Sequence, residues 1–240
     1  MGLNNKIVSY FDKVLYGKYQ DKWDDKLLRD QLLEILRPEH IVLDVGAGRG
    51  RVQEMNFKGR VKRIIGIDPD PRVKENPLVD QGYEGLADHM PFFEDNFFDV
   101  VFCDNVLEHV EFPDKFYKEI ARVIKPGGFF ISKTPNRFYY VAIIAALTPE
   151  SFHKFINKKR GRNESDTFPT FYRANTKQSQ SRYINRNGLT LVKASYFEGR
   201  PEYTRIFFPL YIMGYLFERT VNLLNLNGLK AIIITVSKKN

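Results

Sequence analysis

Four short runs of apolar and aromatic residues after position 40 constrain the fold of this chain most strongly. They are IVLDV (41–45), RIIGID (63–68), FDVVFCD (98–104) and GFFISKT (128–134). Such runs lack polar alternation, and helical stretches separate them, which is typical of parallel strands buried on both faces of an α/β sheet. Residues 113–124 form an amphipathic helical pattern that Pro126 and Gly127 close. We therefore expect an α/β protein with a mostly parallel sheet.

Helical and strand patterns also flank this central region. Apolar residues recur at helical spacing in 7–16, 26–36, 176–187 and 207–225, and two further strand candidates are LTLVKASYF (189–197) and LKAIIITVS (229–237). Gly188 is expected to end the third of these helices.

These patterns suggest an N-terminal helical cap, 1–38, followed by a main domain, 39–240. Segments 137–187 and 200–227 do not follow the strand–helix alternation. We interpret both as elaborations over the carboxyl edge of the sheet, where open α/β folds bind ligands.

Composition excludes several classes of protein. The chain has 240 residues, of which 43% are hydrophobic and 28% charged, so it is not a mainly disordered protein. Its most apolar stretches, 139–147 and 207–217, are shorter than the roughly 18–20 residues that a spanning helix needs. The N-terminus has no secretory pattern, and the single cysteine, Cys103, cannot form an internal disulfide, so we expect a cytoplasmic location.

Positive charge is concentrated in residues 151–205. The net charge is +8, and this window holds twelve basic and four acidic residues, which accounts for the whole excess. Such a zone favours an anionic partner, such as phosphate, nucleic acid or a lipid headgroup. A solvated basic surface is an equally good interpretation.

A glycine-rich turn follows the first strand. In IVLDVGAGRG, Asp44 precedes Gly46, Ala47, Gly48 and Gly50, after which a helix can begin. Glycines there allow a tight turn and the close approach of a ligand. Arg51 stands where a dinucleotide fingerprint needs its third glycine, and the G-K-[ST] of a P-loop is missing. Alone, the turn is a weak signal.

Acidic residues in the next segments strengthen it. Asp68 ends the second strand 18 residues after Gly50, where a carboxylate can accept both hydroxyls of a ribose. The alternative is a helix cap before Pro69. Further on, Ala87 and Asp88 precede Met90 and Phe92, a combination that suits an adenine ring or, equally, an ordinary loop acid with core anchors.

Together the motifs resemble class I S-adenosylmethionine-dependent methyltransferases, most closely the small-molecule group called type 11. The matching segments are LDVGAGRG (43–50), GIDPD (66–70), GLADHMPF (85–92), FDVVFCDNVLEHV (98–110) and IARVIKPGGFFISKTPN (120–136). They occur in the family's order. The resemblance implies S-adenosylmethionine as cofactor and a Rossmann-like seven-stranded, mostly parallel sheet with its last strand antiparallel, N-terminal helices and a helical lid insertion after the fifth strand.

The resemblance also implies a set of cofactor contacts. Asp44 and the turn from Gly46 to Gly50 match the methionine site, and Asn105 matches the position beside the methionyl group. The remaining matches are Asp68 with Pro69 for the ribose, and Ala87, Asp88 and Met90 for the adenine.

Methyl transfer from a sulfonium needs alignment, exclusion of water and, for a protonated acceptor, a general base. His109 is the candidate base, and the alternative is a histidine that caps or packs under the loop. Glu108 and His109 also resemble a metal-holding pattern of ubiquinone-pathway O-methyltransferases. Asn105 replaces an acid of that pattern, so we predict no metal.

The run DTFPTFYRAN (166–175) mixes aromatics, an arginine and an acid. We expect His153, Tyr172 and Arg173 to bind the acceptor, because aromatics stack on ligands and arginine binds anionic oxygens. A structural lid without substrate contact is the alternative.

The sequence thus favours a methyltransferase acting on a small, sugar-linked or lipid-linked acceptor, with oxygen as the expected methylated atom. The alternatives are an RNA or protein methyltransferase and an inactive cofactor-binding scaffold subunit. The strand exit reads DNVL rather than the N/D-P-P-Y/F/W tetrad of base-amino methylases, so a nucleic-acid partner is not expected. Segment 207–224 is a candidate docking face or peripheral membrane contact, or it is buried over the sheet. The sequence leaves the oligomeric state open.

Overall fold

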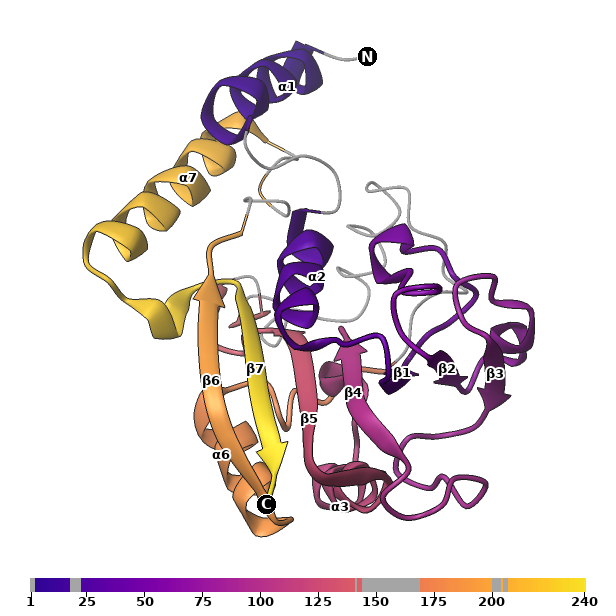
Figure 1. Cartoon of the computed structure of the whole chain (residues 1–240). Coiled ribbons are helices and arrows are strands. Elements are labelled where there is room, and N and C mark those ends of the chain that lie inside the picture. Colours follow the sequence, from indigo (N-terminus) through magenta and orange to yellow (C-terminus); the bar gives the residue numbers. More distant parts are fainter. Residues whose placement is uncertain (1–2, 18–22, 141, 144–168, 200–203, 205–206) are drawn as a thin grey trace. The chain divides into compact units, whose positions relative to one another are not determined.

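The computed structural model describes residues 3–17, 23–140, 142–143, 169–199, 204 and 207–240 (Figure 1). Within them, seven strands form one sheet in the order β3-β2-β1-β4-β5-β7-β6. The strands are β1 (Ile41–Val45), β2 (Arg63–Asp68), β3 (Gln81–Glu84), β4 (Phe98–Asp104), β5 (Ile124–Pro135), β6 (Leu189–Phe197) and β7 (Ile232–Lys239). The α-helices are α1 (Leu3–Tyr16), α2 (Trp23–Ile35), α3 (Pro113–Val123), α6 (Lys177–Arg186) and α7 (Phe208–Leu223).

The strand directions confirm the expected fold class. β1 pairs in parallel with both β2 and β4, β2 pairs in parallel with β3, and β4 does so with β5. β7 lies between β5 and β6 and runs opposite to both (Figure 1). This is a Rossmann-like, mostly parallel sheet whose last strand is antiparallel.

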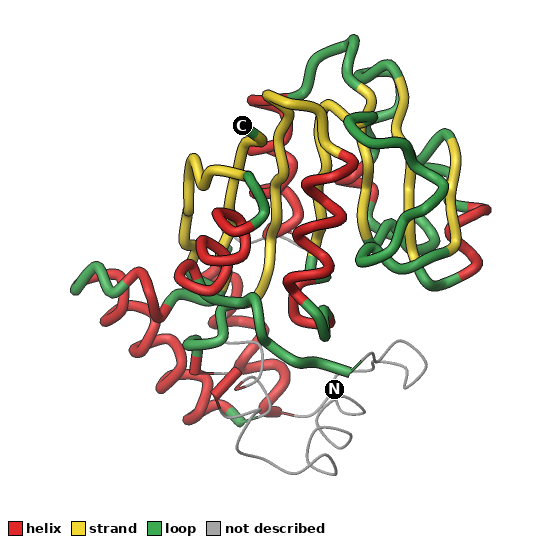
Figure 2. The backbone as a smooth tube through the Cα atoms, turned by 90° about the horizontal axis from the view of Figure 1, so that it is seen from below, coloured by secondary structure: helices red, strands yellow, loops and turns green. Residues whose placement is uncertain are grey.

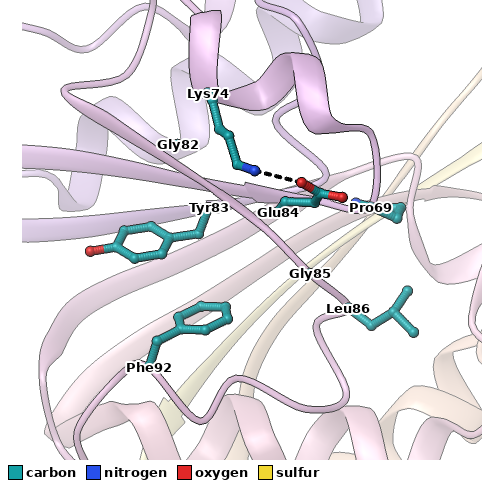
Figure 3. Close-up of a pocket in the computed structure, with 8 residues that line it drawn as sticks. All are labelled: Pro69, Lys74, Gly82, Tyr83, Glu84, Gly85, Leu86 and Phe92. Carbon is teal, nitrogen blue, oxygen red and sulfur yellow. Dashed lines mark hydrogen bonds and ion pairs between the residues drawn. The ribbon is translucent and has the colours of Figure 1, made fainter.

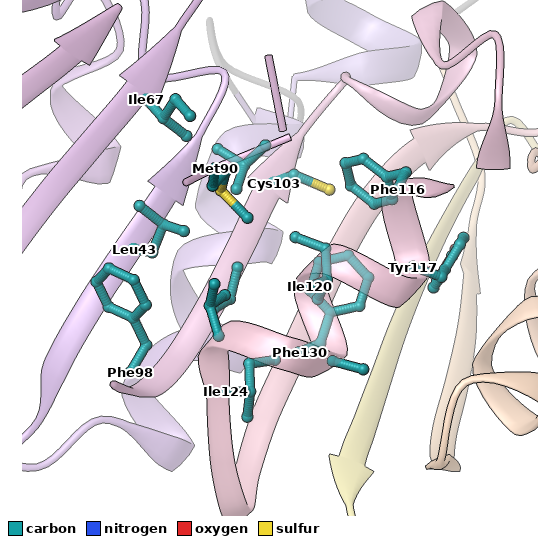
Figure 4. Packing of buried hydrophobic residues seen from close by; sticks show 14 of the residues in the cluster. Leu43, Ile67, Met90, Phe98, Cys103, Phe116, Tyr117, Ile120, Ile124 and Phe130 are labelled. Carbon is teal, nitrogen blue, oxygen red and sulfur yellow. The ribbon is translucent and has the colours of Figure 1, made fainter. Parts of the chain in front are cut away.

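One face of the sheet packs against α3 and α6. Phe116, Tyr117 and Ile120 of α3 are fully buried and lie over the strands (Figure 4). Cys103 belongs to the same cluster and is fully buried. The apolar residues of α3 recur at i and i+4, so the helix has a continuous buried face. Each such aromatic or aliphatic side chain contributes about 1.5–3 kcal/mol by burial.

The opposite face packs against α2, which lies in front of the sheet in Figure 1. Leu28 and Leu32 of α2 are fully buried. Side chains alternate between the two faces along a strand, so Asp44, Phe102 and Asp104 share one face of β1 and β4. Lys133 of β5 pairs with Asp104 and has the same orientation.

The structure differs from the sequence expectations between β1 and β4. Residues 46–97, all of which the structure describes, contain no α-helix, although a helix was expected after Gly50. Two short 3-10 helices, η1 (Gln53–Met55) and η2 (Pro71–Glu75), take the place of longer helices. Figure 2, in which this end of the sheet lies on the right, shows mostly green loops there. A fifth parallel strand, β3, was not among the four runs recognised in the sequence.

The other predicted elements are found close to their expected bounds. β5 begins at Ile124 rather than Gly128, because Ile124 already pairs with Phe98 before a register shift. The helix α6 starts with a capping box, in which the Ser179 N–H donates to Thr176 Oγ1 over 3.0 Å. Gly188 follows α6 with φ +77°, as expected for its stop signal. Segment 144–168, about half of the elaboration expected at 137–187, lies outside the described residues.

The chain divides into two compact units that differ from the sequence division at residue 38. The first comprises Met1–Trp23, Pro135–Pro169 and Tyr196–Ile232; the second comprises Asp24–Thr134, Thr170–Ser195 and Ile233–Asn240. The cap at 1–38 and the elaborations at 137–187 and 200–227 stay predictions.

The first unit contains α1 and α7, which pack through aromatic side chains. Tyr16 and Tyr211 are buried together, with ring centroids 6.3 Å apart, and the Tyr211 hydroxyl donates to Asp12 Oδ1 over 2.9 Å. Glu218 of α7 is fully buried and accepts a hydrogen bond from the Tyr139 hydroxyl. Its second carboxylate oxygen, Oε2, has no hydrogen-bond partner within the described part of the chain. Burial, with the charge of Glu198, raises the pKa of Glu218 to about 7, although the bond from Tyr139 lowers it.

Gly82 of β3 tests the packing at the edge of the sheet. An added Cβ would lie 1.9 Å from the backbone oxygen of Val73, so Gly82→Ala should lower the free energy of unfolding by about 1–3 kcal/mol. The matched control is Gly228→Ala, because no atom lies within 4 Å of its Cβ position. Urea denaturation should separate the two variants, and equal midpoints would contradict the close packing of β3.

Glu218→Gln tests the buried carboxyl in the first unit. An acid with a raised pKa binds more protons in the folded state, so its stabilisation is lost as pH rises from its unfolded pKa through about 7. Between pH 5 and pH 8 the wild type should lose about 2 kcal/mol more stability than the variant. Urea denaturation at both pH values measures this difference, and parallel pH profiles would show that Glu218 does not titrate in this way.

Candidate functional site

The strand order places the candidate site at the carboxyl edge of the sheet, around β1. The chain passes from β1 to β2 and β3 on one side, and then crosses to β4 and β5 on the other. Asp44 pairs with Gly66 on β2 and with Phe102 on β4. Ligands of open α/β sheets bind at such a switch point, beyond the carboxyl ends of the strands.

The glycine turn after β1 folds onto the end of β2. Gly46, Gly48 and Gly50 have φ values of +79°, +51° and +74°, which favour glycine. The N–H groups of Gly46 and Ala47 donate to the Ile67 carbonyl over 2.8 and 3.2 Å. At Gly48, the nearest atom to an added Cβ is Asp68 Oδ2 at 3.9 Å, so none of the described side chains fills the space above it.

Asp68 faces this turn. Its Oδ2 accepts a hydrogen bond from the Gly48 N–H over 2.9 Å, and its Oδ1 accepts one from the Asp70 N–H over 2.8 Å. Burial raises the pKa of Asp68, while these two hydrogen bonds lower it. The cap of η2 is Asp70, not Asp68. A carboxylate and bare backbone therefore lie together at the ends of β1 and β2.

Asn76 binds the backbone of the glycine turn through its side chain, a role that the sequence analysis did not recognise. Its Nδ2 donates to the carbonyls of Ala47 and Gly48 over 2.9 and 3.2 Å, and its Oδ1 accepts from Leu78 N–H. A Cβ at Gly50 would lie 2.3 Å from Asn76 Oδ1. The third glycine is therefore required by contact with Asn76. The Asn76-Pro77 pair is a turn signal, but it does not reveal the partner.

An open groove of about 490 Å³ lies beyond Asp68, at the end of β3 (Figure 3). Pro69, Gly85, Leu86 and Phe92 are among the residues that line it, and Phe92 stacks on Tyr83 with ring centroids 5.0 Å apart. Ala87 and Asp88 follow directly and are half-buried. Met90, one of the predicted adenine contacts, is fully buried in the core, whereas Phe92 is 42% exposed.

His109 lies in a short 3-10 helix, η3 (Leu107–His109), after β4. The segment before α6, residues 169–176, contacts this short helix, because the N–H groups of Phe171 and Tyr172 donate to the Glu108 carbonyl over 2.7 and 3.2 Å. Arg173 donates to the Glu111 carbonyl over 2.5 Å and is exposed. The structure thus brings Tyr172 and Arg173 to the loop of His109. His153 lies outside the described residues.

The Glu108 side chain points into the protein, where it fixes this loop. It is 6% exposed and accepts a hydrogen bond from the Thr134 hydroxyl over 3.2 Å. Asn175 in turn donates to the Thr134 hydroxyl. Burial raises the pKa of Glu108, with opposing contributions from its hydrogen bonds and from His109. Among the described residues, no group of three His, Cys, Asp or Glu side chains is arranged to hold a metal ion.

A second group of residues that the sequence analysis did not recognise is the charged cluster of Lys133, Asp24, Asp25 and Asp104, on the face of the sheet that packs against α2. Lys133 is fully buried, and its Nζ lies 2.8 Å from Asp24 Oδ2, 2.7 Å from Asp25 Oδ1 and 2.8 Å from Asp104 Oδ1. Asp44 is 7% exposed, and no described residue donates a hydrogen bond to its carboxylate. Burial, with the charges of Asp104 and Asp68, raises its pKa. Asn105, the residue after Asp104, has φ +54°, and its N–H donates to the Lys133 carbonyl over 2.9 Å.

Asn76→Ala tests the support of the glycine turn. Removing the amide leaves the Leu78 N–H and the two turn carbonyls without their partner, which should cost about 1–3 kcal/mol of stability. Hydrogen exchange should also quicken at Gly46 and Ala47, because the turn is less constrained. Unchanged exchange and stability would show that the turn holds its shape without Asn76.

Comparisons with known proteins agree with this geometry. Residues 43–132 match a family described as a methyltransferase domain. An uncharacterized methyltransferase of Mycobacteroides abscessus is 36% identical over 100 residues, covering 38% of each chain. A ubiquinone biosynthesis O-methyltransferase of Pseudomonas entomophila is 36% identical over 138 residues, covering 48% of this chain and 56% of the other. The chain spans about half the length, or less, of these two curated relatives.

Solved structures show the same fold at low identity. The YcgJ protein from Bacillus subtilis has a TM-score of 0.56 at 18% identity, covering 89% of this chain and 98% of that one. A putative sarcosine dimethylglycine methyltransferase from Galdieria sulphuraria has a TM-score of 0.57 at 17% identity, covering 97% and 98%. Strand order, glycine turn and matched domain agree: residues 43–132 of this chain match a methyltransferase domain, and the sheet has the fold of class I, S-adenosylmethionine-dependent methyltransferases.

Proposed function

We propose that this chain transfers a methyl group from S-adenosylmethionine to a small, sugar-linked or lipid-linked acceptor, with oxygen as the methylated atom. The observation that carries the proposal is the Asp68 carboxylate, which is bonded to the Gly48 N–H beside an open stretch of backbone at the switch point. A nucleoside needs such an arrangement: an acid for the ribose hydroxyls and bare backbone for close approach.

The other proposed contacts are those that the resemblance to class I methyltransferases implies, and their residues lie at or after the strand ends. Asp44 and the backbone of Gly46, Ala47, Gly48 and Gly50 hold the methionine part, with Asn105 beside it; Asp68 and Pro69 hold the ribose; Ala87 and Asp88 hold the adenine. The groove lined by Leu86 and Phe92 supports the adenine site better than the buried Met90 does. Asp44 supports the methionine site, because a buried carboxylate without a hydrogen bond is matched by an ammonium group.

When bound, the sulfonium supplies an already activated methyl group. The residues of this chain then align the acceptor, exclude water and remove a proton from it. We assign the removal of this proton to His109. The loop of His109 is held at the carboxyl edge by the buried Glu108 side chain and by the hydrogen bond from the Tyr172 N–H to the Glu108 carbonyl. Tyr172 and Arg173, in the segment before α6, contact the acceptor, and His153 is the third residue that we expect to bind it.

The relatives support a small acceptor. Several are named ubiquinone biosynthesis O-methyltransferases, which favours oxygen. One structural neighbour is a geranyl diphosphate C-methyltransferase from Streptomyces coelicolor with geranyl diphosphate and S-adenosyl-L-homocysteine, so the fold also accommodates other acceptor atoms. Seven of the twelve basic residues in window 151–205 lie outside the described residues, and no observation favours RNA.

A lipid-linked acceptor agrees with the surface of α7. Apolar side chains recur along one side of the helix and the turn after it, and more than two fifths of each is exposed: Phe207, Leu210, Met213, Leu216, Leu223, Leu224 and Leu226. Contact of 207–224 with a membrane surface stays a prediction, as does the cytoplasmic location. In the described part of the chain, no helix has both the length and the apolar character to cross a membrane.

Calorimetric titration tests the proposed function. The wild type should bind both S-adenosylmethionine and S-adenosylhomocysteine, and Asp68→Ala should weaken both by about tenfold to a hundredfold, because two charge-assisted hydrogen bonds to the ribose are lost. Asp70→Ala is the matched control, since Asp70 caps η2 next to the site. If the wild type binds neither compound, or if Asp68→Ala binds as well as the control, the proposal fails.

A further inference from the structure

The charged cluster around Lys133 joins three elements of the second unit. Lys133 is on β5, Asp104 is at the end of β4, and Asp24 and Asp25 are in the first turn of α2, all with Nζ–oxygen distances of 2.7–2.8 Å. Burial lowers the pKa of Lys133, but the three carboxylates outweigh it and raise the pKa overall. The lysine therefore stays charged; its Nζ donates hydrogen bonds to Asp24 and Asp25 and forms an ion pair with Asp104.

One ammonium does not neutralise this part of the molecule. Asp24, Asp25 and Asp104 contact Lys133, and Asp44 lies close enough to Asp104 for their charges to interact. When all are ionised, the four carboxylates and one lysine leave an excess of three negative charges. Burial raises the pKa of Asp104 to about 7, although Lys133 lowers it, and burial also raises the pKa of Asp44, so a bound cation and a pH above 7 both favour the ionised cluster. Burying unbalanced charge of one sign is costly, and a cation bound nearby relieves that cost.

The excess lies at the methionine end of the site. Asp104 and Asp44 are on the same face of adjacent strands, and each is at or next to the carboxyl end of its strand. The Lys133 carbonyl binds the N–H of Asn105, which continues the same edge. Asp68 at the end of β2 adds a further carboxylate. The Asp104 side chain is 14% exposed, so its charge is weakly screened by water.

We propose that Asp104, held in place by Lys133, Asp24 and Asp25, makes this site select the cationic methyl donor over its demethylated product. The inference rests on the proposed function. S-adenosylmethionine carries a permanent positive charge on sulfur, whereas the thioether sulfur of S-adenosylhomocysteine is neutral. The two molecules are otherwise alike, so a negative potential at this edge is a means of binding the donor and releasing the product.

Asp104→Asn removes one charge without changing the size of the side chain, and leaves Lys133 paired with Asp24 and Asp25. Calorimetry at about pH 8, above the raised pKa of Asp104, should show affinity for S-adenosylmethionine falling by about tenfold, with less than about threefold change for S-adenosylhomocysteine, because the lost attraction acts on the sulfonium. The ratio of the two dissociation constants is the readout, and it does not depend on turnover.

Asp99→Asn is the matched control. Asp99 is on the same strand, and it pairs with a lysine of β5, Lys125, over 2.7 Å, but at the amino end of the sheet. The control should leave the ratio of dissociation constants unchanged. If Asp104→Asn does not fold, Asp24→Asn removes a more exposed charge of the same cluster and should shift the ratio in the same direction by a smaller factor.

The outcomes are distinguishable. A lower donor-to-product preference in the cluster variant, but not in Asp99→Asn, supports the inference. The inference is overturned if Asp104→Asn weakens both ligands equally or leaves the ratio unchanged. If Asp104→Asn does not fold, the same results in Asp24→Asn overturn it. The cluster then only anchors α2 to the sheet. Failure of the wild type to bind either ligand removes the proposed function itself.

Discussion

The pairing of β1 with both β2 and β4 is the constraint on which the candidate site depends. Parallel strands bring their carboxyl ends to one edge, so residues far apart in the chain meet there: the glycine turn, Asp68, Asp104 and the loop of His109. The crossover from β3 to β4 leaves space beside β1. A short N–H to carboxylate bond, from Gly48 to Asp68, then fixes the shape of the turn before any ligand binds.

Polar groups at this edge are held by partners from the interior of the sheet. Glu108 is bonded to Thr134 on one face, and Asp104 contacts Lys133 on the other. Both partners come from the last residues of β5, so this one strand fixes the groups on both sides of the edge. Buried ionic groups add little net stability, but their geometry is rigid, which suits a site that must hold reacting groups in place.

Much of this arrangement follows from the sequence, because its signals are local. The runs that form β1, β2 and β4 are apolar and β-branched, and the glycines and Asp68 stand at fixed distances from them. β3 was not recognised because QGYE is short and polar. What makes it a strand is its place at the edge of the sheet and the close packing of Gly82 against the Val73 backbone, and neither can be read from the local sequence. The Lys133 cluster was missed because Asp24 and Asp25 resemble ordinary acids in a helix's first turn, and their partner lies over 100 residues away.

The central claim is that Asp68 and the bare turn form a cradle for an adenosyl group. A crystal structure of the protein with S-adenosylhomocysteine tests this most directly. The account predicts the ribose hydroxyls within about 3.2 Å of the Asp68 carboxylate, with the methionine part over Gly48. A ligand bound elsewhere, or a ribose that makes no contact with Asp68, would contradict it.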